Sequence, residues 1–259
     1  MAEERLKAER AELMNCLLDM GQSLLQSGAE ISRVEDTISR MAKAYGCARA
    51  DVFVITSIIS LSMEFPEEEA LTATRRIASG GDTDFTRLEQ LNHISRSCCK
   101  NPLPVDELRS ELQRVSDERK PFGQLLVGGV LAAGSFAVFF GGSFWDGLAA
   151  AVFALGISVL QRKLGSTDVT PVGANLLLSL ITGLVAGLIC PAIPALHPDK
   201  VLIGDIMLLI PGLAMINAVR NILGGDTISG LVRLTESLVW AAVLAGGFVM
   251  AMLIVNRLL

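Results

Sequence analysis

The stretch VGANLLLSLITGLVAGLICP, residues 172–191, contains no Asp, Glu, Lys or Arg. A helix of about 20 apolar residues is long enough to cross the hydrocarbon core of a bilayer. Such a helix also satisfies its own backbone hydrogen bonds, which lipid cannot do for it. Ser179, Gly183 and Gly187 recur at every fourth position, a spacing that lets two membrane helices approach closely. This segment therefore predicts an α-helical integral membrane domain.

Four more apolar segments have a similar length, so we predict five transmembrane helices. Before the first of them, residues 1–120 hold 16 of the 22 Lys and Arg residues and 21 of the 27 Asp and Glu residues. The rest of the chain holds only six of each. This contrast predicts a cytoplasmic domain over 1–120 and a five-span transmembrane domain over 121–259. The four further predicted spans are 122–141, 144–161, 201–222 and 231–255.

Residues 1–120 predict a small α+β domain. Apolar residues recur at helical spacing, and Ser27 with Glu30 resembles a capping box before the second helix. Residues 51–65 are rich in β-branched side chains of alternating character, which indicates one strand. The predicted elements are helices over 8–26, 31–45 and 84–99, a helix opened by Pro104, and strands over 51–65 and 71–77.

Charge predicts how the chain lies across the membrane. Residues 1–7 are charged and lack the apolar core of a signal peptide, so we expect the first domain to stay in the cytoplasm. Positive residues collect on the cytoplasmic side of membrane proteins. With the N-terminus inside and five spans, most basic side chains of the membrane domain lie inside and the C-terminus lies outside. The inner group is Lys120, Arg162, Lys163, Arg220 and Arg233, and the outer pair is Lys200 and Arg257.

Several classes of function are disfavoured by the sequence. No run of Lys or Arg suggests a nucleic-acid partner. Two isolated histidines and five cysteines without a C-x-x-C pair predict no metal site and no disulfide framework. There is no G-x-G-x-x-G or Walker sequence, so we expect no nucleotide cofactor, no catalytic residues and energy from an ion or proton gradient.

The fourth predicted span is interrupted by Pro211 and Gly212. Proline removes an amide donor and clashes with the preceding helical turn. Transporters use broken helices of this kind as substrate sites, because half-helix ends offer partial charges to ligands. A simple proline kink explains the same two residues equally well.

Charged and amide side chains surround this interruption. Asn217, Arg220 and Asn221 share a helical face, and charged residues within spans are functional by default. Arg220 or Arg233 can hold a carboxylate through a bidentate fork, and Asp205 or Glu236 can carry a coupling proton or bind an amino group. The alternatives are topology anchors at Arg220 and Arg233 and a structural Arg233–Glu236 pair. The full candidate translocation set is Asp205, Pro211, Gly212, Asn217, Arg220, Asn221, Asp226, Arg233 and Glu236.

Two groups of motifs resemble the bacterial threonine/serine exporter family. The first is Gly28-Ala29-Glu30-x-x-Arg33-Val34-Glu35-Asp36-Thr37-Ile38, followed by Ala44-Tyr45-Gly46. The second is Ile210-Pro211-Gly212, Asn217-Ala218-Val219-Arg220-Asn221, Gly225-Asp226, Ser229-Gly230-Leu231-x-Arg233 and Glu236. From the first group, Gly28, Glu30, Arg33 and Glu35 are the candidate residues of the cytoplasmic domain. The family often has Asp where this chain has Asn221, so no ion role is carried over there.

The resemblance implies a multi-pass exporter of small polar metabolites in the bacterial cytoplasmic (inner) membrane. It implies the longer subunit of a split exporter, similar to a pair associated with succinate export. The expected substrate is a small amino acid, threonine or serine, or a carboxylate such as succinate. The expected partners are the lipid bilayer and a short five-span membrane subunit, or copies of the chain itself.

Two rival functions remain open at this point. A membrane-anchored enzyme or sensor would act through residues 1–120, where Glu30, Arg33 and Glu35 would otherwise serve in capping and surface contacts. A structural or assembly protein would need no transport path, but charges inside spans cost several kcal/mol unless they are paired or used.

Overall fold

The computed structural model of the chain describes residues 2–66, 69–77, 83–118, 121–165 and 169–258. The described residues form two compact units. The first comprises residues within 1–118 together with Leu213–Thr235, and the second comprises residues within 119–212 together with Glu236–Leu259. The predicted division into 1–120 and 121–259 concerns exposure to water or lipid and stays a prediction. Lys120 lies outside the described residues.

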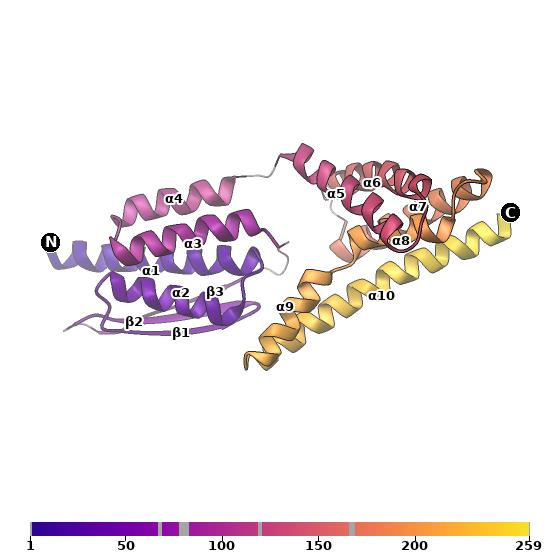
Figure 1. Cartoon of the computed structure of the whole chain (residues 1–259). Coiled ribbons are helices and arrows are strands. Elements are labelled where there is room, and N and C mark those ends of the chain that lie inside the picture. The colour runs from indigo at the N-terminus through magenta and orange to yellow at the C-terminus, as the bar shows by residue number, and fades with distance from the viewer. Residues whose placement is uncertain (1, 67–68, 78–82, 119–120, 166–168, 259) are drawn as a thin grey trace. The chain divides into compact units, whose positions relative to one another are not determined.

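The N-terminal part of the first unit has three layers (Figure 1). A three-stranded antiparallel sheet of order β1-β2-β3 forms one layer, α1 and α2 lie against it, and α3 and α4 cover these helices. Its elements are α1 (Ala2–Gln26), α2 (Ile31–Ala44), β1 (Arg49–Ile55), β2 (Ile58–Glu64), β3 (Leu71–Arg76), α3 (Phe85–Lys100) and α4 (Val105–Asp117).

Large aliphatic side chains hold these layers together. On α2, apolar residues at spacings of three and four positions are all buried, as the periodicity predicted. They meet Leu17 and Met20 of α1 and Ile59 and Leu61 of β2, each with no exposed surface. The predicted helices over 84–99 and after Pro104 are also confirmed, with Asp84 accepting a hydrogen bond from the Arg87 amide as N-cap.

The prediction of one strand over 51–65 was wrong. The chain turns back at residues 56–57, so that Ile55 pairs with Ile58 and two strands form a hairpin. Alternate residues of a strand face opposite sides of the sheet, and the reversal changes which of them face the core. Val54 is therefore buried, whereas Phe53 is 62% exposed. Neither turn residue is Gly, Asn, Asp or Pro, so the usual signal for a two-residue turn is absent. The predicted partner strand over 71–77 is confirmed as β3.

The predicted capping box at Ser27 was also wrong. The Ser27 hydroxyl donates to the Ser23 carbonyl instead and belongs to the end of α1. Gly28 has a φ of +89°. Its amide donates to Leu25 O and the Ala29 amide donates to Leu24 O, the two bonds of a Schellman motif. Gly28 is thus the glycine that ends α1, and α2 begins without a side-chain cap.

The apolar helices are consistent with a membrane domain. Among the described residues, four helices are long and apolar enough to cross a bilayer: α5 (Phe122–Phe139), α6 (Phe144–Leu164), α7 (Pro171–Ile189) extended by the 3₁₀ turn η1 (Cys190–Ala192), and α10 (Thr227–Leu258). A fifth span results only if α8 (Pro198–Leu209) and α9 (Gly212–Leu223), bent by 52°, count as one.

Small residues pack the helices of the second unit. A buried cluster of alanines lies where α5, α6, α7 and α8 meet. Gly183 of α7 faces Ala251 and Phe248 of α10, and Gly247 of α10 faces Ser179. The small-residue stripe of residues 179–187 therefore packs a helix pair, as its spacing predicted.

Candidate functional site

The two sequence motif groups meet in the first unit. On α9, Asn217 Nδ2 donates to the Gly28 carbonyl at 3.3 Å, and Arg220 Nη1 lies 3.3 Å from Glu30 Oε1. Arg33 Nε is 4.0 Å from the other Glu30 oxygen. Residues nearly 190 positions apart thus form one polar cluster, which we call the α9 cluster: Gly28, Glu30, Arg33, Asn217 and Arg220.

Local structure explains how the α1–α2 corner presents its acceptors. The Schellman bonds fix the backbone at Gly28, where a Cβ would also come within 3.0 Å of the Thr83 hydroxyl. The Asp84 amide donates to the Ser27 carbonyl and holds the corner from a second direction. The Gly28 carbonyl and the Glu30 carboxylate are therefore held on one rigid corner.

Glu35 lies on the same helix as Glu30 but faces the sheet. Its carboxylate accepts a hydrogen bond from the Val54 amide at 3.0 Å. Burial raises the pKa of Glu35, the Val54 bond opposes that shift, and the nearby Asp226 carboxylate raises it further. Asp226 follows Gly225, whose φ is +99°, and immediately precedes α10.

Asn221 is the most enclosed polar residue of α9. It is 3% exposed, and its Nδ2 has no hydrogen-bond partner among the described residues. Buried amides are normally hydrogen-bonded, so an unpaired donor indicates a site for a bound group or water. The amide nitrogens of Asn217 and Asn221 and the Arg220 guanidinium are all N–H donors, which suits a carboxylate ligand.

The predicted interruption at Pro211 is a complete break between helices. α8 ends at Leu209, α9 begins at Gly212, and the Gly212 amide donates to Ile210 O. A Cβ at Gly212 would meet no atom of the described residues within 4 Å, so packing among them does not require a glycine there. This geometry is a broken helix rather than a continuous kinked one.

Asp205 lies in the second unit, one turn before that break. It has no exposed surface, and neither carboxylate oxygen has a hydrogen-bond partner in the part of the chain that the structure describes. The adjacent Gly204 packs so closely that a Cβ would come within 2.6 Å of the Ala133 carbonyl. A carboxylate in such surroundings needs a proton or a cation to offset its charge. Within the described residues, no group of three metal-ligating side chains lies nearby to hold a metal.

The last two predicted residues lie on α10. Arg233 belongs to the first unit and is half-buried, while Glu236 begins the α10 portion of the second unit and is exposed. Because the α9 cluster and Asp205 belong to different units, the structure brings together only the residues within the first.

Sequence reasoning missed a buried carboxylate at the start of α6. Asp146 has no exposed surface and accepts hydrogen bonds from the His197 amide at 2.7 Å, the His197 ring at 3.0 Å and the Ser143 amide at 2.7 Å. The Asp146 amide in turn donates a hydrogen bond to the Ser143 hydroxyl oxygen, which completes a capping box. The Ser-x-x-Asp pattern before an apolar run was the available signal. His197 is isolated in the sequence because its partner lies 51 positions away.

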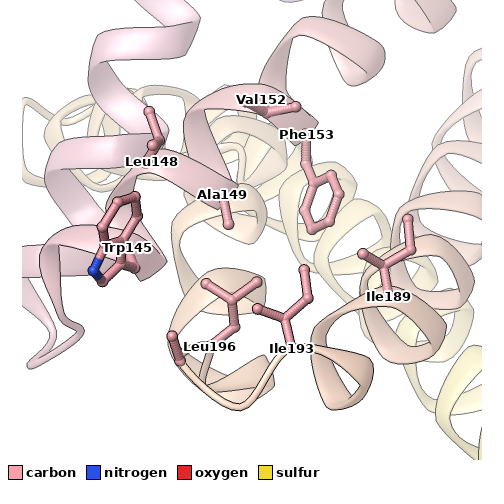
Figure 2. A pocket seen from close by; sticks show the side chains of 9 residues that line it. Trp145, Leu148, Ala149, Val152, Phe153, Ile189, Ile193 and Leu196 are labelled. Atoms are coloured by element: carbon pink, nitrogen blue, oxygen red, sulfur yellow. The ribbon is translucent and has the colours of Figure 1, made fainter.

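An apolar cavity of about 310 Å³ lies beside this pair (Figure 2). Figure 2 shows Phe153 of α6 facing Ile193 of the α7–α8 connection. No charged side chain is among the described residues that line it, so it does not suit a charged metabolite. Its lining is Trp145, Leu148, Ala149, Val152, Phe153, Ile189, Ile193, Ala195 and Leu196.

Comparison with known proteins identifies relatives of two kinds. The chain is 24% identical to the probable succinate transporter subunit YjjP of Klebsiella aerogenes over 95% of both chains, and equally identical to the Escherichia coli K12 protein of that name. It is 21% identical to the threonine/serine exporter of Corynebacterium glutamicum, covering 92% of this chain but 50% of the relative. No solved structure is significantly similar to it.

A family model gives the broader assignment. The model of the threonine/serine exporters, ThrE, matches residues 15–255. This family consists of transporters, so the chain is not an enzyme, and its apolar helices make it a multi-pass protein of the inner membrane. The resemblance first seen in the two motif groups is thus confirmed over nearly the whole chain. The chain belongs to the threonine/serine exporter family.

Proposed function

We propose that this chain is one subunit of a secondary-active exporter of small metabolites that carry a carboxylate. The observation that carries this proposal is that α9, which begins at a break in an apolar helix pair, holds three side chains with N–H donors, Asn217, Arg220 and Asn221. Threonine, serine and succinate, the substrates in the names of its relatives, share the carboxylate that such donors recognise.

The buried Asp205 carboxylate supports coupling to a proton gradient. A carboxylate with no exposed surface, without a group of three metal-ligating side chains among the described residues, suits a proton better than a metal ion. In this proposal Asp205 gains and loses a proton during the cycle, and Arg220 binds the substrate carboxylate. Arg233, Glu236 and Asp226 stay proposed members of the path. Arg33 and Glu35 stay proposed functional residues of the cytoplasmic domain.

Relative length supports a second subunit. The chain spans 95% of the succinate transporter subunits but only about half of the threonine/serine exporters. An exporter built from related halves needs both to form the interface where midplane sites lie. We propose a second five-span protein or another copy of this chain as the missing half.

The Arg220–Glu30 contact supports five spans. It favours an arrangement in which the end of α9 lies on the same side of the membrane as the N-terminal domain. In this proposal α5, α6 and α7 make three crossings and the α8–α9 pair returns as the fourth. α10 is then the fifth, with the N-terminus inside and the C-terminus outside. A reporter fused to the C-terminus tests this, because a cytoplasmic C-terminus would mean four spans and a re-entrant α8–α9 pair.

The export test uses a strain that lacks its own exporters, loaded with Thr- and Ser-containing dipeptides or with succinate. The chain is expressed alone and with a short five-span protein of the family. We expect efflux on co-expression, and its loss in Asp205→Asn and in Arg220→Ala. Arg40→Ala, in an exposed pair with Asp36, is the matched control and should retain efflux. Absence of efflux with both proteins in the membrane would contradict the proposal.

A further inference from the structure

We infer that the Glu30 carboxylate occupies the position on α9 where the carboxylate of the transported metabolite binds, so that substrate and the α1–α2 corner compete for Arg220. This inference rests on the proposed function. It assigns Glu30 the role of an internal, displaceable substitute for substrate.

The geometry of the ion pair suits displacement. Arg220 Nη1 and Glu30 Oε1 are 3.3 Å apart, longer than the roughly 2.8 Å of a strong charge-assisted bond. The arginine side chain is 62% exposed and the glutamate side chain 29%. Exposed ion pairs of this kind contribute little and exchange readily with other ligands. A free carboxylate that makes two parallel bonds with the guanidinium would replace the glutamate at no loss of charge pairing.

The two acceptors that pair with the α9 donors both belong to the α1–α2 corner. Asn217 donates to the Gly28 carbonyl, and Arg220 contacts Glu30 two residues further along. The corner is held rigid by the Schellman bonds and by the Asp84–Ser27 bond. Separation of the corner from α9 would therefore release Asn217 and Arg220 together. The unpaired Asn221 Nδ2 lies one turn from Asn217 on the same helix.

The helix that carries these donors starts at a break. Residues 210–211 separate α8 from α9, and the first residue of α9 is a glycine without close packing. Hinges are commonly a few residues at the end of an element that absorb a backbone rotation. α9 can therefore move away from the corner without unfolding α8.

The inference predicts opposite effects for the two partners. In the free protein, the fraction of molecules with Arg220 available sets the apparent affinity for a carboxylate. Glu30→Gln removes the competing charge and should tighten binding of threonine or succinate about two- to fivefold, the range that a weak exposed pair allows. Arg220→Glu should abolish binding. Threoninamide, which has no carboxylate, should bind neither the wild-type protein nor the Glu30→Gln variant.

The deciding experiment is the charge swap. Binding of radiolabelled threonine and succinate is measured on the full chain with its partner in nanodiscs, for wild type, Glu30→Gln, Arg220→Glu and the double variant Glu30→Arg/Arg220→Glu. We expect the double variant to regain wild-type thermal stability, since the pair is restored, but to bind no substrate. Asp36→Asn/Arg40→Gln, which alters an exposed pair of α2, is the matched control with unchanged binding.

Each outcome supports or overturns the competition. Binding restored by the charge swap would overturn the inference, because the pair would then be only structural. Unchanged or weaker binding in Glu30→Gln would also overturn it. If Arg220→Glu fails to fold, Glu30→Gln and threoninamide still determine whether Glu30 and substrate compete. Export that is lost in Arg220→Ala while Glu30→Gln binds normally would leave the proposed function standing and remove only the competition.

Discussion

The cores of the two units are built from different side chains. In the N-terminal unit, the residues with no exposed surface include Leu17, Ile31, Met41 and Leu61. In the second unit, five of the seven residues of the buried cluster are alanines. In water, burial of large apolar groups provides the driving force, whereas lipid is as apolar as leucine and rewards close contact instead. The difference agrees with the predicted division between a domain in water and a domain in lipid, which stays a prediction.

The largest effect is expected from removal of a large side chain in the first unit. Leu17→Ala should lower the free energy of unfolding of that unit by about 4 kcal/mol, because it removes buried methyl groups and leaves a cavity. Hydrogen exchange of α1 amides in the full chain measures this loss. Leu6→Ala, at a side chain that is 41% exposed, is the control. Equal effects at both positions would contradict the comparison.

In the second unit, an added side chain at a close helix contact should lower stability. Gly204→Val should destabilise it by about 3 kcal/mol, since the new Cβ would meet the Ala133 carbonyl, a backbone atom that cannot rotate away. The thermal midpoint of the purified chain in nanodiscs measures the effect. At Gly156 a Cβ would meet no atom of the described residues within 4 Å, so Gly156→Val should leave the midpoint nearly unchanged. A tolerated valine at 204 would mean that the helices are not in close contact.

A smaller effect is expected from the polar bonds that fix the α7–α8 connection to α6. Asp146→Ala leaves the amides of His197 and Ser143 without their acceptor and should cost about 2 kcal/mol. His197→Ala removes only the ring bond and should cost less. Faster hydrogen exchange at residue 197 in Asp146→Ala, and not in His197→Ala, is the expected result. Similar exchange in both variants would assign the role to the ring.

The smallest effect concerns pH. Because the pKa of Glu35 is raised by burial, the folded state holds this proton more tightly than the unfolded state. The stability that protonated Glu35 contributes is complete below the ordinary glutamate pKa. It is lost as pH rises through the raised pKa of Glu35 in the folded state. Glu35→Gln retains an acceptor for the Val54 amide and should flatten this slope, as followed by exchange of that amide. An unchanged slope would indicate that Glu35 is not the titrating group.

Sequence periodicity predicted the elements whose signal is local. α2, α3 and α4 follow from apolar spacing and from Asp84 or Pro104 at their starts. The hairpin at 56–57 was missed because its turn lacks the usual residues, and the role of Ser27 was missed because the backbone of Gly28 already satisfied the helix end. Whether a two-residue turn or a side-chain cap forms depends on competition among local hydrogen bonds. A single sequence does not show which of these bonds is the more stable.

The candidate site was predictable as a set of residues but not as a contact. Charges within apolar segments selected Asp205 and Arg220, and the resemblance selected Glu30. That Glu30 meets Arg220 depends on chain folding across 190 positions. Asp146 and His197 escaped notice for the same reason, since each has an ordinary local explanation and only their pairing is informative.

The alanine cluster where α5, α6, α7 and α8 meet also affects how easily these helices can slide. Alanine has no side-chain torsion to reset, so two alanine faces can shear past each other without any change of rotamer and at little entropic cost. Interlocked leucines would have to disengage first. Alanine faces therefore allow these helices to slide past one another more easily than leucine faces would.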